Sequence, residues 1–454
     1  MPYEPTPESV RQHPVPDWFH DAKLGIFVHW GLYSVPAWAP LTGELDKVVS
    51  ERGWEHWFAH NPYAEWYANS MKIEGSPTRQ HHARAYGADF PYHAFAATFN
   101  GGLARWNPDT WAALFAEVGA RYVVLTTKHH DGFLLWPSRT PNPFIEDYFA
   151  ARDLVGDLAE SVCAHGMRMG LYYSGGLDWT FLGEPICDLP SLVAAVPQQP
   201  EYIAYADAHW RELIDRYQPS VLWNDIGYPF AANVDALFAD YYNTLPDGVV
   251  NDRFSMPPGA GNRHFDFTTP EYAVYDDIQP HKWESTRGIG FSFGYNQNED
   301  ARAFLSVEEL VHSFVDIVSK NGNLLLNIGP MADGTLPEGQ RERLRGLGAW
   351  LQVNGEAIFG TRPWARAEGD AGEGIGVRFT QKGDALYVIV LGAPAGSQVS
   401  IASLAVDANA VVTLLGYDGA LAWAQDGARL TVTLPGSLPE APAYSLRITP
   451  KPRS

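Results

Sequence analysis

Residues 107–132, NPDTWAALFAEVGARYVVLTTKHHDG, contain the pattern from which the architecture can be predicted. Asn107 and Pro108 form a helix cap and first turn, WAALFAEV supplies an apolar helical face, and Gly119 ends the helix. The apolar run RYVVLTT follows at once and is typical of a buried strand. The stretch therefore predicts a helix that leads into a strand, with two histidines and an aspartate just beyond the strand.

The same pattern of strand, polar loop and amphipathic helix recurs along the chain. Repeated units with apolar strands predict a parallel sheet, either doubly wound or closed into a barrel. Polar and aromatic groups follow several strands rather than one switch point, which favours an α/β fold of the (β/α)8-like TIM barrel type. The expected strands are 25–31, 121–127, 168–174, 220–225, 248–254 and 323–329, and the expected helices are 107–119, 153–166, 201–217, 233–244, 306–319 and 338–360.

After residue 360 the helical pattern gives way to short runs of alternating apolar and polar residues, such as GVRFTQ, ALYVIVLG and RLTVTL. Turn-forming stretches such as APAGS and GYDGA separate these runs, which predicts a small antiparallel β-sandwich. The length of the chain fits one barrel and one accessory domain. We therefore expect a catalytic barrel over residues 1–360 and a C-terminal β-sandwich over residues 361–454.

The composition limits the classes of partner. The 454 residues include 32 Lys and Arg against 53 Asp and Glu, a net charge of −21, which disfavours binding to nucleic acid or an anionic membrane surface. Two cysteines cannot supply a disulfide framework. The N-terminus lacks the basic patch and apolar core of a secretory signal, which predicts a soluble cytoplasmic protein. The alternative is a mature enzyme whose signal was removed.

Three interpretations compete for His129, His130 and Asp131: a metal site, a site that binds hydroxyls or performs catalysis, and a cluster of polar contacts that only closes a loop. Both histidines reach one site only where the chain leaves β geometry, as Gly132 would allow. A zinc site needs a further ligand, and the motif lacks the helical His-Glu-x-x-His spacing and a cysteine cluster. Hydroxyl binding is favoured, because two imidazoles can donate or accept hydrogen bonds at fixed angles.

Other strand ends carry related chemistry. Trp223 and Asp225 lie two positions apart and share a strand face, as do Phe27 and His29. Aromatic residues make up 13% of the chain, and aromatic faces beside acids and imidazoles suit a carbohydrate cleft. Hydrolysis of a glycosidic bond also requires two carboxyl groups, one ionised and one protonated. Asp225 is the first candidate, and the second would be Glu271, Glu284, Glu65 or Asp178.

Six motifs carry a family resemblance: WFHDAKLGIFVHWGLYSVPAWAP, AEWY, TTKHHDGFLLWPS, YYSGGLDW, VLWNDIG and NGNLLLNIGPMADGTLP. Between about Trp18 and Gly355 they follow the order found in the α-L-fucosidases of glycoside hydrolase family 29, which this part of the chain resembles. The C-terminal region resembles the β-sandwich of that family only in pattern. The resemblance implies an exo-acting, retaining hydrolase that releases terminal α-L-fucose from glycosides or oligosaccharides through a covalent fucosyl-enzyme.

The resemblance also implies roles for individual residues. Asp225 would be the nucleophile, because it occupies the Trp-x-Asp strand end of the family. His129 and His130 would then clamp sugar hydroxyls rather than a metal ion, and no cofactor is expected. The other hydroxyl-binding residues would be His29, Glu65 and Trp66 with Arg253 beside them, and the pocket for the C6 methyl group would be Phe27, Tyr172, Trp223 and Phe293.

The acid/base lies in a segment that varies within the family. In the members that this chain most resembles it is the glutamate of a short Glu-Tyr element after the arginine-bearing strand, which here is Glu271. No basic residue lies within five positions of Glu271, whereas Glu284 lies two residues after Lys282 and three before Arg287. Because a general acid must stay protonated, we expect Glu271 to be the acid and Glu284 to be a structural ion-pair partner.

Other functions stay open at this point. They are a retaining hydrolase of the same fold for a related sugar, a catalytically silent sugar-binding barrel, and a zinc-dependent hydrolase built on the HHD motif. The expected partner is a fucosylated oligosaccharide or glycoside, and small imported oligosaccharides would suit a cytoplasmic enzyme. Self-association into a homo-oligomer also stays open.

Overall fold

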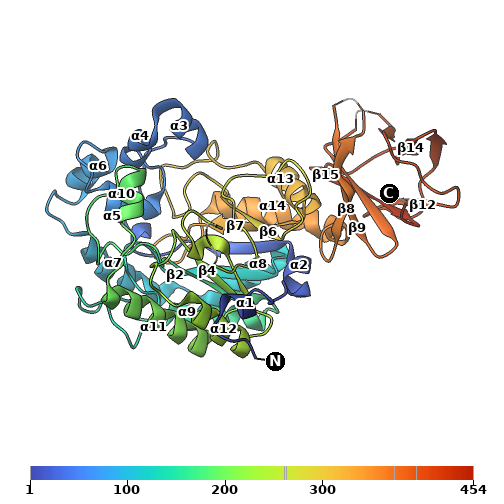
Figure 1. Ribbon diagram of the computed structural model, residues 1–454. Coiled ribbons are helices and arrows are strands. Elements are labelled where there is room, and N and C mark those ends of the chain that lie inside the picture. The colour runs from blue at the N-terminus through green and yellow to red at the C-terminus, as the bar shows by residue number, and fades with distance from the viewer. Residues whose placement is uncertain (1, 260, 262, 373, 395, 453–454) are drawn as a thin grey trace.

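The computed structural model describes residues 2–259, 261, 263–372, 374–394 and 396–452. A parallel sheet lies at the centre of the larger part of the molecule and is surrounded by helices (Figure 1). The C-terminal strands, coloured orange and red, form a separate unit at one side (Figure 1). The chain thus has the barrel and the accessory β-domain that its sequence pattern predicts.

The central sheet contains parallel strands in the order β5-β4-β3-β2-β1-β7-β6. The strands are almost completely buried, which explains their unbroken apolar runs. Alternate residues such as Phe27, Tyr172 and Trp223 pack together inside the barrel. The strands are β1 (Leu24–Val28), β2 (Tyr122–Lys128), β3 (Arg168–Tyr173), β4 (Val221–Asn224), β5 (Val249–Val250), β6 (Trp283–Gly288) and β7 (Gly322–Ile328).

Residues 266–272 connect the two edges of this sheet. A parallel bridge joins Asn251 to Phe267 on one side, and a parallel bridge joins Glu271 to Thr286 on the other. The segment forms no regular strand of its own, in keeping with Pro270, which has no N–H to donate to a ladder. It takes the place of the eighth strand of a (β/α)8-like barrel and positions Glu271.

Two parts of the barrel differ from the expected pattern. The strand predicted at 248–254 is reduced to β5, and Asp252–Phe254 form a 3-10 helix. Arg253 therefore lies in this helix rather than at the end of the strand. β6 was not predicted, because its sequence WESTRG shows neither an apolar run nor a regular alternation.

Five of the six helices predicted to follow strands begin and end within two residues of the predicted bounds, whereas the helix predicted at 338–360 ends at Asn354, where a 3-10 helix over Gly355–Ala357 begins. The side chain of Asn107 caps α8 (Pro108–Val118) by accepting a hydrogen bond from the Asp109 N–H, and Gly119 ends the helix at φ +95°. Ser306 and Glu309 form a capping box at the start of α13 (Val307–Ser319). The other helices of this kind are α9 (Leu154–Ala164), α11 (Pro200–Tyr217), α12 (Val234–Thr244) and α14 (Glu338–Asn354).

Shorter helices are inserted into the barrel and were not predicted, because such short segments show no clear helical period. Several of them, including α3, α4, α6 and α10, group together at one side of the barrel (Figure 1). They are α3 (Leu45–Arg52), α4 (Trp54–Ala59), α5 (Tyr67–Ser70), α6 (Pro77–Ala85) and α7 (Phe95–Gly102) between β1 and β2, and α10 (Leu189–Ala194) between β3 and α11; α1 (Pro7–Val10) and α2 (Asp17–Ala22) precede β1.

Two antiparallel sheets form the C-terminal unit, with strand orders β12-β15-β10-β9-β8 and β11-β14-β13. Side chains from both sheets, including Phe379, Val388 and Val432, share one apolar core, as in a β-sandwich. Residue 360 lies between the 3-10 helix at Gly355–Ala357 and β8. The strands are β8 (Arg362–Asp370), β9 (Gly376–Lys382), β10 (Ala385–Leu391), β11 (Gln398–Ile401), β12 (Val411–Leu414), β13 (Trp423–Asp426), β14 (Arg429–Thr433) and β15 (Ala443–Thr449).

Three strands of this unit, β8, β11 and β13, were not predicted: β8 contains one fully buried residue, β13 contains none, and β11 is only four residues long. A weakly buried strand needs little apolar alternation, so its sequence carries little signal. Among the described residues, no helix combines the length and the apolar character that crossing a membrane would require.

Candidate active site

One cavity brings together the residues that the sequence analysis selected. All of the predicted site residues except Arg253 line it, and several of them directly follow strands of the barrel. The described lining residues are Phe27, His29, Leu45, Trp54, Trp57, Phe58, Asn61, Tyr63, Glu65, Trp66, His129, His130, Tyr172, Leu192, Trp223, Asp225, Ile226, Glu271, Thr286 and Phe293.

The carboxylate of Asp225, directly after β4, is held by three hydrogen-bond donors. The Tyr172 hydroxyl donates to Oδ2 at 2.9 Å, and Arg253 Nη1 donates to Oδ1 at 3.0 Å. The N–H of Ile226 also donates to Oδ1, at 3.0 Å. Ile226 has φ +57°, a conformation that costs a β-branched residue about 1–3 kcal/mol. The strained turn therefore helps to fix the direction of the Asp225 carboxylate.

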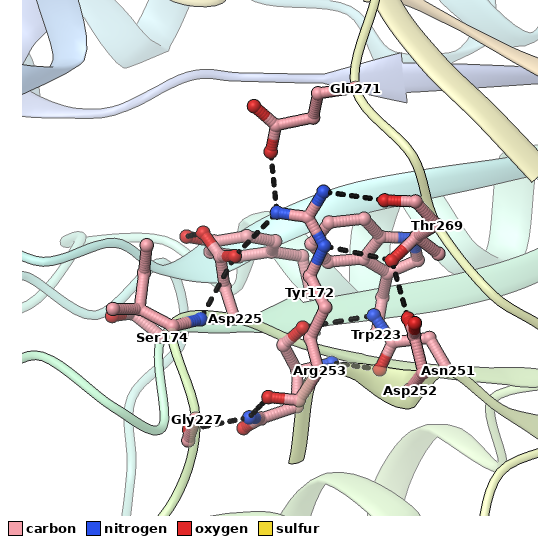
Figure 2. Close-up of polar contacts among 12 residues, drawn as sticks. Tyr172, Ser174, Trp223, Asp225, Gly227, Asn251, Asp252, Arg253, Thr269 and Glu271 are labelled. Carbon is pink, nitrogen blue, oxygen red and sulfur yellow. Dashed lines mark hydrogen bonds and ion pairs between the residues drawn. The ribbon is translucent and has the colours of Figure 1, made fainter. Parts of the chain in front are cut away.

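Arg253 joins the two candidate catalytic carboxyl groups (Figure 2). Its Nη1 atom contacts both Asp225 and Glu271, while its Nε and Nη2 atoms donate to Thr269 at 2.8 Å each. The guanidinium also lies over Trp223, 4.7 Å from the ring centroid. Burial would lower the pKa of Arg253, but the carboxylates of Glu271 and Asp225 raise it well above its ordinary value. Arg253 is therefore a fixed cation shared by both acids.

Although no basic residue lies within five positions of Glu271 in the sequence, the folded chain places a cation against it. Arg253 contacts it from 18 positions away in the sequence. Residues 266–272 close the barrel and carry Glu271 back onto the loop after β5, so spacing along the chain could not reveal this contact. Arg253 itself does not appear among the described residues that line the cavity; its polar atoms are used by the two acids and Thr269.

The ring of His29, which follows β1, is oriented by Asn327 at the end of β7. The two side chains are hydrogen-bonded at 2.6 Å between His29 Nδ1 and the Asn327 oxygen, and the Asn327 amide group donates to the Phe293 carbonyl. Burial lowers the pKa of His29 to about 3, so the ring is neutral at physiological pH. Because Nδ1–H donates to Asn327, Nε2 carries the lone pair and can accept a hydrogen bond from a sugar hydroxyl.

The chain leaves regular β geometry before the histidine pair, which is the condition under which both histidines can reach one site. The register of β2 shifts near its end at Lys128, and the rings of His129 and His130 lie 4.0 Å apart. Burial holds the pKa of both histidines far below the ordinary value. Ser174 Oγ donates to the Leu177 carbonyl, so His130 Nδ1 is the donor in its 2.6 Å hydrogen bond with Ser174. His130 Nε2 is then an acceptor.

The three residues of the HHD motif have different surroundings. His130 Nε2 lies 4.0 Å from Asp225 Oδ2, and His129 Nδ1 is buried without a hydrogen-bond partner in the described structure. Asp131 instead accepts hydrogen bonds from the Tyr92 hydroxyl at 2.8 Å and from the Phe133 N–H at 3.1 Å. The histidines therefore face the cavity, while the aspartate closes the loop behind them.

Glu65 and Trp66 extend the polar wall of the cavity. Glu65 Oε2 accepts a hydrogen bond from the Gly294 N–H at 2.7 Å, and burial raises the pKa of Glu65 to about 8. A carboxyl with this pKa is largely protonated at neutral pH and can donate to a sugar oxygen. The Trp66 ring lies 5.3 Å from His130 and 5.5 Å from Trp179.

Aromatic side chains form the apolar part of the cavity. Trp223 lies 5.0 Å from Phe27 and is stacked on Tyr172 at 5.5 Å between ring centroids. Phe293 packs against His29 at 5.1 Å. These side chains are almost fully buried, so they are held rigidly by the barrel interior. They form the apolar surface that the sequence analysis assigned to the sugar methyl group.

Glu284 is not the ion-pair partner that its neighbours in sequence suggested. It is fully buried, accepts hydrogen bonds from the Tyr122 hydroxyl and from Trp223 Nε1, the latter at 3.0 Å, and is absent from the described cavity lining. Lys282 instead donates to the Asn321 carbonyl at 3.0 Å. Burial raises the pKa of Glu284 to about 7. Its place is beneath the cavity, where it supports Trp223.

Asp178, the remaining candidate for the second carboxyl, also has a structural position. It forms a completely buried ion pair with Lys128 at 2.9 Å and accepts a hydrogen bond from the Thr180 hydroxyl. The next residue, Trp179, donates its N–H to the His130 carbonyl at 2.8 Å. Asp178 therefore supports the loop that carries the histidine pair.

Among the residues that the structure describes, one group has the spacing to hold a metal ion, formed by His13, His264 and Asp266. Its polar atoms already have partners: His13 Nδ1 lies 2.9 Å from Asp266 Oδ1, and the Tyr242 hydroxyl donates to Asp266 Oδ2 at 2.9 Å. The group is not part of the cavity lining and does not include the histidine pair of the HHD motif.

Several residues that shape the site were not selected from the sequence. Ser174 and Asn327 lie in motifs that were quoted above, but their roles as orienting partners of histidines emerged only from the contacts. Thr269 and Thr286 lie on segments with no recognisable motif, and Tyr63 belongs to an insertion. Short polar side chains of this kind give no sequence signal until the fold shows what they contact.

Comparisons with known proteins agree with this geometry. A family model described as alpha-L-fucosidase matches residues 1–356, and one described as alpha-L-fucosidase C-terminal domain matches residues 374–449. The alpha-L-fucosidase of Branchiostoma floridae is 36% identical over 445 residues, which cover 95% of this chain and 92% of that protein. The tissue alpha-L-fucosidase of Rattus norvegicus is 33% identical over 469 residues, which cover 98% and 92%.

Solved structures show the same relationship. The Thermotoga maritima alpha-fucosidase in complex with fucose is 44% identical with a TM-score of 0.88, and the match covers 98% of this chain and 100% of that one. The complex of the Thermotoga maritima enzyme with a mechanism-based inhibitor gives 45% identity and a TM-score of 0.89, with the same coverage. Both the barrel and the C-terminal unit are matched, and the chain belongs to the α-L-fucosidase family.

Proposed function

We propose that the protein is an exo-acting, retaining α-L-fucosidase in which Asp225 is the nucleophile and Glu271 the acid/base. The observation that carries this assignment is the contact of both carboxyl groups with one nitrogen of Arg253. Two hydrogen bonds to one nitrogen place the accepting oxygens within roughly 6 Å of each other. Retaining glycosidases hold these groups about 5–5.5 Å apart, whereas inverting enzymes need about 6.5–9.5 Å.

The shared arginine suits a double displacement. In the first step the Asp225 carboxylate attacks the anomeric carbon, and protonated Glu271 gives its proton to the departing glycosidic oxygen. Asp225 loses its negative charge in the ester as Glu271 gains one, so Arg253 keeps an anionic partner throughout. In the second step ionised Glu271 takes a proton from water, which hydrolyses the ester and restores the Asp225 carboxylate.

The rest of the cavity supports fucose as the sugar. The Nε2 atoms of His29 and His130 are positioned to accept hydrogen bonds from hydroxyls, and Glu65 can donate one. The aromatic side chains of Phe27, Tyr172, Trp223 and Phe293 form an apolar surface on which the C6 methyl group can pack. A catalytically silent barrel is disfavoured because both carboxyl groups are present and share Arg253, and the zinc mechanism is distinguished by the response to EDTA.

The substrate preference tests this proposal. L-Galactose carries a hydroxyl where L-fucose has its methyl hydrogen, and Phe27, Tyr172, Trp223 and Phe293 would have to desolvate that hydroxyl. An apolar pocket rejects such an addition moderately, so kcat/KM for an aryl α-L-fucoside should exceed that for the α-L-galactoside roughly 100-fold. EDTA should leave the rate unchanged. Equal kcat/KM values would contradict the methyl pocket, and loss of activity with EDTA would favour the zinc mechanism.

Two further parts of the proposal concern the setting of the enzyme. Cys163 and Cys187 are both free thiols, which supports a reducing compartment and thus a cytoplasmic location. Small fucosylated oligosaccharides would then be the natural substrates. Association into a homo-oligomer stays a prediction.

A further inference from the structure

The cavity extends beyond the proposed fucose-binding set. The additional lining residues with apolar side chains come from the inserted helices α3, α4 and α10 and from the turn after β4. They are Leu45, Trp54, Trp57, Phe58, Leu192 and Ile226. A leaving group that departs from the sugar would meet this surface, because it lines the same cavity as Asp225 and Glu271.

A chain of aromatic rings leads from the sugar site to this surface. His130 lies 5.3 Å from Trp66, Trp66 lies 5.8 Å from Phe58, and Phe58 lies 6.1 Å from Trp54. On α4, Trp57 and Phe58 are buried in an apolar cluster, whereas Trp54 is only partly buried. The buried rings therefore hold the partly exposed Trp54 in place, so that little conformational freedom is lost when a ligand packs on it.

Leu192 and Ile226 complete the surface. Both are partly buried and pack against the same cluster as Trp54. The strained φ of Ile226 directs its N–H to the Asp225 carboxylate while its side chain lines the cavity. The residue after the proposed nucleophile therefore contributes to both parts of the cavity.

The polarity of the surface limits what it can bind. Outside the proposed fucose-binding and catalytic set, the polar side chains among the described lining residues are Asn61, Tyr63 and Thr286, and none is charged. None of the described residues on this surface is a cation that could bind an anionic group, and the chain carries a net charge of −21. A flat, uncharged and largely apolar group fits these walls best, because aromatic rings pack well against such faces.

We propose that Trp54, Leu192 and Ile226 form the binding site for the aglycone and select leaving groups with a flat apolar face. This chemistry is shared by an aryl ring and by the C–H face of a pyranose. The inference rests on the proposed fucosidase function and adds the class of leaving group. The same site holds the acceptor when an alcohol replaces water: the alcohol oxygen attacks the fucosyl ester, Asp225 leaves as carboxylate, and Glu271 takes the alcohol proton.

The test compares substrates that share the sugar and differ in the leaving group. An aryl α-L-fucoside can reach α4, whereas the single fluorine atom of α-L-fucosyl fluoride cannot. Trp54→Ala and Leu192→Ala should each lower kcat/KM for the aryl fucoside roughly 10-fold, because an aromatic or aliphatic contact of about 1.4 kcal/mol is lost. Both variants should hydrolyse fucosyl fluoride at the wild-type rate.

Matched controls lie next to the substituted residues. Val193 is 56% exposed, neighbours Leu192 on α10 and does not line the cavity, so Val193→Ala should leave both substrates unaffected. Glu55→Ala provides the same control beside Trp54 on α4, since Glu55 is exposed. Trp54→Phe keeps a flat ring and should recover most of the activity on the aryl fucoside.

Each outcome separates the two proposals. If the wild-type protein hydrolyses neither substrate, the fucosidase function itself is contradicted. If it hydrolyses both and Trp54→Ala and Leu192→Ala slow both substrates equally, or neither, the aglycone site is overturned while the function stands. A disaccharide with a terminal α-L-fucose then identifies the class of leaving group that the site binds. If the variants lose kcat/KM on the aryl fucoside alone, the site binds aromatic aglycones. If they also lose kcat/KM on the disaccharide, the site binds flat faces of either kind.

Discussion

Asp225→Gly is expected to lower the rate on aryl α-L-fucosides by roughly 10⁴-fold or more, because no fucosyl ester can form without the carboxylate. Added azide should restore part of the turnover. The azide ion would enter the space that the carboxylate leaves and attack the anomeric carbon from the same face. The product should then be β-L-fucosyl azide, which NMR identifies.

Tyr172→Phe is the matched control for this variant. It removes the 2.9 Å hydrogen bond to Asp225 Oδ2 but leaves the carboxylate in its place. A smaller loss, roughly 10-fold, corresponds to one hydrogen bond to a charged group, and azide should have no effect on this variant. An Asp225→Gly variant that retains most of its activity, or that yields no azide adduct, would move the nucleophile to another residue.

Glu271→Ala is expected to slow substrates with poor leaving groups by roughly 100-fold or more, because their departing oxygen needs a proton. Activated aryl fucosides should lose less in the first step, since their leaving group departs without help. Azide should again raise turnover, but here it attacks the fucosyl ester from the opposite face. The product is then α-L-fucosyl azide, so the two variants are distinguished by the anomer that they form.

Glu284→Gln provides the control for the acid/base assignment. Glu284 lies beneath Trp223 and contacts no open space in the described cavity, so its substitution should change all substrates by a similar factor and should show no azide effect. A strong dependence on the leaving group in Glu284→Gln, with none in Glu271→Ala, would transfer the acid/base role to Glu284.

The barrel was predictable from the sequence where strands are long and buried. The run at 121–127 shows an unbroken apolar pattern because both faces of β2 are covered, and its helix carries a clear cap at Asn107. β6 and the segment 266–272 gave no such signal. Their place in the barrel depends on pairing with distant strands and on buried polar groups such as Glu284. The hydrophobic periodicity of the sequence indicates neither of these features.

The site shows the same division. The separation of two positions between Trp223, on β4, and Asp225, directly after it, was enough to predict that their side chains share one face. The family resemblance supplied the other residues of the predicted site. The charge environment was not predictable, because Arg253 reaches Glu271 only after the barrel closes. Likewise, the aromatic surface of α4 and the partners that orient His29 and His130 depend on contacts between segments far apart in the sequence.

The stereochemistry of the reaction tests the central claim most directly. Proton NMR recorded from the start of hydrolysis identifies the fucose anomer that is released first, before mutarotation mixes the two forms. Two successive inversions, at Asp225 and then by water, predict that α-L-fucose appears first. If β-L-fucose appears first, the reaction is a single inversion, and the assignment of Asp225 as nucleophile is contradicted.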